Sequence, residues 1–281
     1  MFTQISYWAF RDGATGKRNV IEAIGLAKAA GFEGIELCVS AEGDITPDTP
    51  ADKCREISAA AKSMGMKIAS TASGLLWDAN PASADAATRK RALDITIKSL
   101  RVTRDLGAKF LLVLPGAVDV FFKPGGEVVP YDDCHKRALA FARKVAKAAA
   151  KLGVFACFEN VWNRFLLSPL EFRDFVDAAG KGAGSYFDVG NVWLTGYPQH
   201  WIKVLGRRIK AVHVKDFKRA VGNVSGFCQL LDGDVPLAES LALLARQGYK
   251  GPVTAEVFPG PDDDEMTFLR TVAERIRKIM P

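Results

Sequence analysis

The chain has 281 residues, of which 48% are apolar and 25% are charged, and its formal net charge is +6 at pH 7. This composition is typical of a folded globular protein, and no apolar run approaches the roughly 18 residues that a membrane span needs. The basic residues are scattered among acidic ones, which argues against a nucleic-acid-binding surface.

The start of the chain and its cysteines indicate a reducing compartment. Residues 1–10, MFTQISYWAF, lack the basic start and long apolar stretch of a secretory signal peptide, so we expect a cytoplasmic protein. The five cysteines are odd in number, lie far apart and form no CxxC pair. Their spacing predicts neither a disulfide framework nor a structural zinc site.

Strands and helices are expected to alternate along the whole chain. Amphipathic helical patterns end at glycines such as Gly31, Gly107 and Gly153, because glycine readily takes the left-handed conformation that ends a helix. Eight such units over residues 1–281 predict a single-domain α/β fold, the (β/α)8 TIM barrel. An open doubly wound sheet is the alternative, although no GxGxxG motif follows the first strand. The expected strands are apolar or β-branched runs at residues 3–8, 34–39, 67–72, 109–114, 154–159, 185–189, 209–214 and 252–257.

The expected strand-to-helix connections include the longest loops, and in a barrel active sites lie on that face. The loop of residues 115–126 combines glycines and prolines with Phe121 and Phe122. We interpret this loop either as a lid or as a cover for the barrel rim.

Four consecutive expected strands each carry a residue that can bind a metal ion near the carboxyl end. These residues are Glu159, Asp188, His213 and Glu256, in chain order. Because the carboxyl ends of parallel barrel strands converge on one mouth, we expect the four side chains to meet. Three carboxylates that close cannot all stay ionised without a cation between them. The pattern therefore predicts one divalent ion, of which Mn²⁺, Mg²⁺ or Co²⁺ suits the oxygen-rich set best and Zn²⁺ is the remaining alternative.

Other polar residues near these strands have two interpretations each. Glu36, inside the second strand, is either a partner of a metal ligand or a structural carboxylate. Asp216 is either a residue that orients His213 or a helix cap. Arg164 and Arg219 lie beyond ligand-bearing strands and are candidates for substrate binding, with a solvated or ion-paired loop charge as the alternative.

The motifs ENVWNRFLLSP, FDVGNVW, AVHVKD and VTAEV, in this order, resemble the xylose isomerase-like TIM-barrel superfamily. The similarity is to its sugar-phosphate isomerase/epimerase branch, which includes ketose 3-epimerases and L-ribulose-5-phosphate 3-epimerase, and it covers nearly the whole chain. It implies that Glu159, Asp188, His213 and Glu256 bind the metal, and that Glu159 and Glu256 also act as the catalytic acid/base pair. Arg219 matches a family arginine that contacts the substrate.

Two positions depart from the pattern of this branch. Asn191 stands where many epimerases carry a histidine, three residues after Asp188, and this change alters a hydrogen bond to the substrate. Phe165 stands where several ketose 3-epimerases have a further glutamate. The identity of the sugar therefore stays open.

The resemblance implies a metal-dependent isomerase or epimerase that acts on a keto sugar or sugar phosphate through an enediolate. It also implies a homo-oligomer, either a dimer or a tetramer, with no membrane or nucleic-acid partner. The rival functions are an inosose dehydratase-like lyase, a hydroxypyruvate isomerase-like enzyme and a barrel that binds sugar without reacting. An apurinic endonuclease is the most distant rival, because its three-zinc site needs more than the three histidines of this chain.

Overall fold

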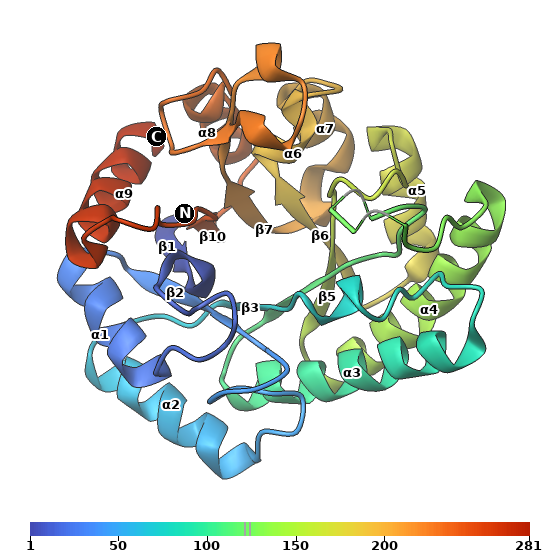
Figure 1. Cartoon of the computed structure of the whole chain (residues 1–281), viewed down its shortest axis with the longest axis horizontal. Coiled ribbons are helices and arrows are strands. Elements are labelled where there is room, and N and C mark those ends of the chain that lie inside the picture. The colour runs from blue at the N-terminus through green and yellow to red at the C-terminus, as the bar shows by residue number, and fades with distance from the viewer. Residues whose placement is uncertain (121, 124) are drawn as a thin grey trace.

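A computed structural model describes residues 1–120, 122–123 and 125–281. Eight parallel strands close into a barrel in the order β1-β10-β7-β6-β5-β4-β3-β2, and helices surround it (Figure 1). The predicted (β/α)8 TIM barrel is therefore confirmed, and the open sheet is excluded. The barrel strands are β1 (Phe2–Ser6), β2 (Gly34–Cys38), β3 (Ser70–Ala72), β4 (Phe110–Val113), β5 (Phe155–Glu159), β6 (Ala183–Asp188), β7 (Ile209–Val214) and β10 (Pro252–Ala255).

The outer layer consists of α-helices that pack on the barrel, with shorter 3₁₀ turns in the connections. The α-helices are α1 (Val20–Ala30), α2 (Ala51–Ser63), α3 (Ala86–Asp105), α4 (Tyr131–Leu152), α5 (Pro169–Ala179), α6 (Val189–Trp193), α7 (Pro198–Leu205), α8 (Leu237–Arg246) and α9 (Glu265–Ile279). The 3₁₀ helices are η1 (Tyr7–Ala9), η2 (Leu75–Trp77), η3 (Gly206–Arg208), η4 (Arg219–Val221) and η5 (Val224–Gly226). None of the helices that the structure describes has the length and apolar character that crossing a bilayer requires.

Each predicted strand overlaps an observed one, and the differences have local causes. The first strand ends at Ser6 because the Ser6 hydroxyl accepts a hydrogen bond from the backbone of Trp8 and caps η1. The last strand ends at Ala255, so Glu256 lies just beyond it. The sequence did not predict the antiparallel pair β8 (Asp216–Phe217) and β9 (Phe227–Cys228), which lies in the connection after β7.

Strand periodicity places the predicted metal ligands at the mouth of the barrel. Side chains on a strand alternate between two faces, so residues two apart point the same way. Cys157, Tyr186 and Ala211 belong to a small buried apolar cluster, separate from the larger core. Two residues further along the same strands lie Glu159, Asp188 and His213, and the strand register pairs Asp188 with His213. The closed barrel therefore sets these side chains next to one another above a packed interior.

Asp216 organises the long loop of residues 217–235, which belongs to the connection after β7. Its buried carboxylate accepts four backbone N–H groups from this loop, those of Phe217, Leu231, Gly233 and Val235, at 2.8 to 3.1 Å. All four bonds go to the loop, so Asp216 is a loop anchor and neither of the two interpretations from sequence holds.

We expect Asp216→Ala to lower the free energy of unfolding by about 1–3 kcal/mol, because buried backbone donors lose their acceptor. Limited proteolysis within residues 217–235 should become faster. Asp232→Ala is the matched control, since Asp232 lies in the same loop and makes only a surface ion pair with Arg275. Its effect should stay within about 0.5 kcal/mol. Equal cleavage rates for the two variants would show that Asp216 does not anchor the loop.

Candidate metal centre

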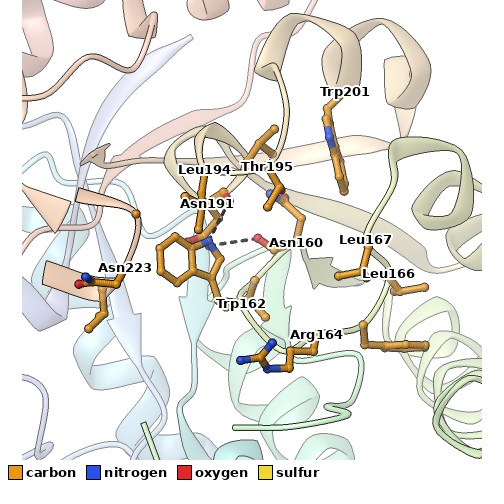
Figure 2. Close-up of a pocket in the computed structure, with 15 residues that line it drawn as sticks. Asn160, Trp162, Arg164, Leu166, Leu167, Asn191, Leu194, Thr195, Trp201 and Asn223 are labelled. Atoms are coloured by element: carbon orange, nitrogen blue, oxygen red, sulfur yellow. Dashed lines mark hydrogen bonds between the residues drawn. The ribbon is translucent and has the colours of Figure 1, made fainter. Parts of the chain in front are cut away.

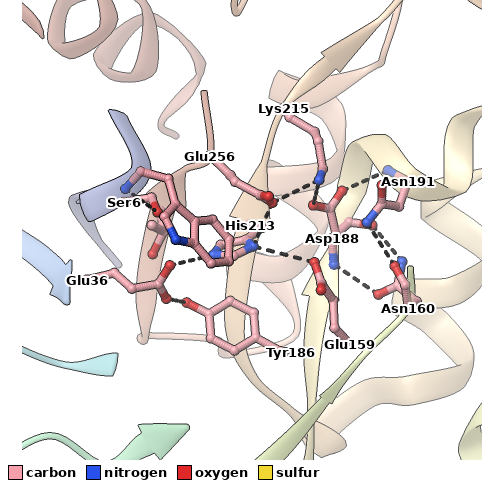
Figure 3. Close-up of polar contacts among 12 residues, drawn as sticks. Ser6, Glu36, Glu159, Asn160, Tyr186, Asp188, Asn191, His213, Lys215 and Glu256 are labelled. Atoms are coloured by element: carbon pink, nitrogen blue, oxygen red, sulfur yellow. Dashed lines mark hydrogen bonds and ion pairs between the residues drawn. The ribbon is translucent and has the colours of Figure 1, made fainter. Parts of the chain in front are cut away.

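The four predicted ligands converge at the carboxyl ends of the strands. One ligand atom from each of Glu159, Asp188, His213 and Glu256 lies within 4.8 Å of those of the other three. Figure 3 shows these side chains pointing toward one another from neighbouring strands. None of them is more than 9% exposed, so water does little to screen the charges that they carry.

A carboxylate on β2 fixes the orientation of the His213 ring. Glu36 Oε1 lies 2.8 Å from His213 Nε2, and Glu36 Oε2 accepts the Ser70 hydroxyl at 2.8 Å and the Tyr186 hydroxyl. Because Glu36 accepts the hydrogen bond that Nε2–H donates, the lone pair of Nδ1 is left facing the site. Nδ1 lies 2.9 Å from a Glu256 oxygen and 3.6 Å from a Glu159 oxygen. A lone pair so close to two carboxylates needs a proton or a metal cation between them.

Two asparagines hold Asp188 so that one carboxylate oxygen faces the cluster. Asp188 Oδ1 accepts the Asn191 backbone N–H at 2.7 Å, and the Asn160 amide pairs with the backbone N–H and carbonyl of Asp188 at 2.9 and 2.8 Å. Within the described part of the chain, Asp188 Oδ2, His213 Nδ1 and Glu256 Oε2 have no hydrogen-bond partner, although each lies at ion-pair distance from a neighbour. Buried ligand atoms without hydrogen bonds, converging on one point, fit a bound cation.

Lys215 supplies a positive charge that the sequence analysis missed. Its Nζ lies 3.1 Å from Asp188 Oδ2 and 2.8 Å from Glu256 Oε2, and its side chain is only 15% exposed. One ammonium stands against four carboxylates, because Glu36 and Glu159 also touch the site. Lys215 alone therefore leaves the site negative, and the residues present still fit a divalent cation.

The pKa shifts of these groups show how strongly they interact. Burial raises the pKa of Asp188 to about 7 and also raises the pKa of Glu159. Burial opposes ionisation of Glu256 as well, but Lys215 and His213 outweigh it and hold the pKa of Glu256 well below its ordinary value. Burial would lower the pKa of His213, yet the carboxylates around it outweigh this effect and raise it well above its usual range. The site thus retains protons that a metal ion would displace.

A hollow of about 480 Å³, here called the mouth pocket, opens beside the cluster and has Glu256 and Lys215 in its wall. Most of its wall is apolar and includes Phe258 as well as Trp77 and Phe122, whose rings are in edge contact. Phe122 thus lies at the rim of the mouth, where both interpretations of its loop place it, whereas Phe121 lies outside the described residues.

The two predicted arginines are held by groups of the protein itself. Arg164 Nε donates to Asp119 Oδ2 at 3.0 Å, and its side chain is 69% exposed. The Arg219 guanidinium stacks 3.7 Å from the centre of the Trp193 ring and donates to the carbonyls of Trp193 and Gly196 at 2.7 Å each. Contact of either arginine with a substrate stays a prediction.

Strand periodicity could have revealed the role of Lys215, whereas Glu36 was already a candidate partner of a metal ligand because its charge lies inside a strand. Lys215 follows His213 by two residues, and residues two apart in an extended segment share a face. Glu36 stands in the middle of a buried strand, where a charge must have a partner. What the sequence could not show is which partner each one finds.

Comparisons with known proteins agree with this fold. A sequence model of the family described as xylose isomerase-like TIM barrel matches residues 24–272. SgbU of Escherichia coli (strain K12), provisionally named L-ribulose-5-phosphate 3-epimerase, is 28% identical over an alignment of 249 residues, and the match covers 84% of this chain and 83% of SgbU. Among solved structures, D-psicose 3-epimerase with D-tagatose from Clostridium cellulolyticum H10 superposes with a TM-score of 0.81 at 19% identity, over 100% of this chain and 99% of that one. An L-ribulose 3-epimerase gives a TM-score of 0.78 at 18% identity, and the match covers 99% of this chain and 94% of that one.

We expect Glu36→Gln to weaken the affinity for Mn²⁺ by about 10 to 100-fold. Glutamine has one acceptor oxygen where Glu36 uses two, so either His213 or the Ser70 and Tyr186 hydroxyls lose their acceptor. Isothermal titration calorimetry measures the dissociation constant without any need for turnover. Glu33→Gln, a half-exposed carboxylate just before β2, is the matched control and should bind Mn²⁺ like the unaltered protein. Unchanged affinity in Glu36→Gln would remove Glu36 from the support of the metal site.

Proposed function

Because the chain belongs to the xylose isomerase-like TIM barrel family, we propose that it is a metal-dependent isomerase or epimerase of a keto sugar. The observation that carries the proposal is the convergence of three carboxylates and one imidazole at the mouth of the barrel. The epimerase names of SgbU and of the solved structures support the choice of reaction.

Glu159, Asp188, His213 and Glu256 are the proposed ligands of one divalent ion, with Mn²⁺, Mg²⁺ or Co²⁺ favoured by the oxygen-rich set. When bound, such an ion would polarise the ketone of the sugar and stabilise the enediolate that forms when a neighbouring carbon loses a proton. Glu36 fixes the ring of His213, and Asn160 and Asn191 fix Asp188. The ligand set is thereby preorganised by hydrogen bonds that do not depend on the substrate.

Glu159 and Glu256 are the proposed acid/base pair. They approach His213 from strands on its two sides, since Glu159 ends β5 and Glu256 follows β10 in a barrel where β6 and β7 lie between. In an epimerase, one carboxylate would remove a proton from carbon and the other would return a proton to the opposite face. In an aldose–ketose isomerase, the same pair would move the proton between adjacent carbons.

Lys215 and Asn191 also face the substrate in this proposal, because both line the mouth pocket. The Lys215 ammonium would stabilise negative charge that develops on a sugar oxygen. Arg164 and Arg219 remain candidates for contacts with parts of the substrate further from the reacting carbons.

The charges around the mouth pocket favour a sugar without phosphate. Among the described residues that line it, Lys215 is the only cation, and both Asp188 and Glu256 already engage it. A phosphate would need a free guanidinium, ammonium or helix N-terminus there. The aromatic side chains Trp77, Phe122 and Phe258 instead suit the apolar C–H faces of an uncharged sugar.

Incubation of the Mn²⁺-loaded protein with free and phosphorylated ketoses in deuterated water tests the function directly. We expect deuterium at C3 of an unphosphorylated ketose, and label at C1 or C2 would identify an aldose–ketose isomerase. Protein treated with a chelator is the control and should give no label until Mn²⁺ is restored. An unsaturated or deoxy keto product would identify a dehydratase instead, and absence of label in every sugar would refute the proposal.

We expect Glu159→Gln and Glu256→Gln each to lower turnover by at least about 10² to 10⁴-fold at saturating Mn²⁺, because each removes a positioned acid/base group. Both variants should keep the folded barrel, as circular dichroism and thermal unfolding would show. Glu239→Gln, an exposed position on α8, is the matched control and should keep full activity. Near-normal turnover in either active-site variant would exclude that glutamate from the mechanism.

A further inference from the structure

A second hollow of about 490 Å³, here called the side chamber, adjoins the mouth pocket. Val161, Trp162, Asn191 and Val224 line both hollows, so the two spaces share a wall. Figure 2 shows Trp162 and Asn191 on one side of the side chamber and Leu166, Leu167 and Trp201 on the other. None of the four proposed metal ligands lines the side chamber.

The wall of the side chamber is apolar and almost uncharged. Leu166, Leu194 and Trp201 contribute to it, and of its lining residues, all of which the structure describes, only Arg164 carries a charge. Arg164 is paired with Asp119, as described above. The side chamber therefore provides no unpaired charge to a ligand.

The amide groups in this wall are already bonded within the protein. Asn160 pairs with the backbone of Asp188, and Asn191 Nδ2 donates to the Asn160 carbonyl at 3.0 Å. Asn223 donates to the carbonyl of Val221 at 3.2 Å. Each of these amides already uses part of its hydrogen-bonding capacity within the protein, so sugar hydroxyls that entered the side chamber would leave water for few remaining partners.

The rim of the side chamber exposes apolar surface beside the reaction site. Leu167 is 65% exposed and Val224 is 50% exposed. A volume near 490 Å³ lies within the range of small-molecule sites. An apolar ligand group would remove this surface from water at a gain of about 25 cal/mol per Å².

We propose that the side chamber binds an apolar substituent, such as an aromatic ring, carried by the same keto sugar whose ketone lies in the mouth pocket. This inference rests on the proposed function for the reacting end of the substrate. Trp162 and Val224 line both hollows, so the hollows are adjacent, and the proposal requires a substituent long enough to reach past this shared wall. The substituent is attached away from the reacting carbons, because the metal ligands that serve those carbons lie outside the side chamber.

The test compares ketohexoses with their 6-O-benzyl ethers on the Mn²⁺-loaded protein. Calorimetry measures the dissociation constant of each compound, and deuterium exchange from solvent measures the KM. We expect the benzyl ether of at least one ketohexose to bind about 10 to 200-fold more tightly than its parent, the range by which apolar pockets discriminate. Equal affinity of every ether and its parent would overturn the proposal.

Leu167→Asp and Leu170→Asp form a matched pair of variants. Both leucines are exposed and lie near the start of α5, but only Leu167 lines the side chamber. Leu167→Asp should lower the preference for the benzyl ether, the ratio of the two dissociation constants, by about tenfold or more. Leu170→Asp should leave this ratio unchanged. An equal loss in both variants would contradict the side chamber as the binding site.

Calorimetry and deuterium exchange together distinguish failure of this proposal from failure of the proposed function. Tight binding of the benzyl ether that Leu167→Asp removes, without exchange in any sugar, would refute the proposed reaction and uphold the side chamber. Deuterium exchange without any preference for benzyl ethers would support the proposed reaction and refute the side chamber as a binding site. Sedimentation of the unaltered protein and of Leu167→Asp tests whether a second copy of the chain occupies the side chamber instead. If the unaltered protein is an oligomer that Leu167→Asp dissociates, and no benzyl ether is preferred, the side chamber is an interface between copies and the proposal is overturned.

Discussion

The crowding of negative charge around one imidazole ring is the constraint on which the site depends. Glu36 occupies one nitrogen of His213, while Glu159 and Glu256 crowd the other. In a buried site such charges repel strongly, and Lys215 compensates only part of them. The closed barrel prevents relaxation, because each carboxylate belongs to a different strand or strand end and could move away only by disturbing the sheet. This arrangement fits the divalent cation of the proposed function.

The interior of the barrel below His213 supports this arrangement through an asymmetric distribution of polar groups. On the side of β1, β2, β3 and β10, Gln4 donates to Ser70 at 2.7 Å and to Thr254 at 3.1 Å, and Ser70 donates to Glu36. On the side of β4 to β7, the interior is largely apolar. Tyr186 joins the two halves through its hydroxyl on Glu36. The polar half fixes Glu36, and Glu36 in turn fixes the ring that faces the metal site.

The barrel and the convergence of the four proposed ligands were predictable from sequence because both depend on local patterns. Strand ends are marked by the change from apolar to polar residues, and the barrel topology then brings those ends together. The pairing of Lys215 with Asp188 and Glu256 depends on three strands and on side-chain conformation, which no local pattern contains. The same holds for Arg219, whose stacking on Trp193 follows from how η4 and α6 meet. A family resemblance places an arginine at that position but does not determine where its guanidinium points.

The two proposals assign reaction chemistry and substrate selection to different parts of this molecule, and one loop connects these parts. The strand ends carry the charged cluster, which in the proposed function acts on a ketone next to a carbon that bears a proton. The loop of residues 217–235, held by Asp216, contributes Val224 to both hollows and Phe227 to the mouth pocket. Binding energy gained from a group in the side chamber would therefore also position the loop that covers the reacting end. Selectivity in such a site acts on turnover as well as on affinity, because the remote contact helps to hold the reacting carbon against its acid/base pair.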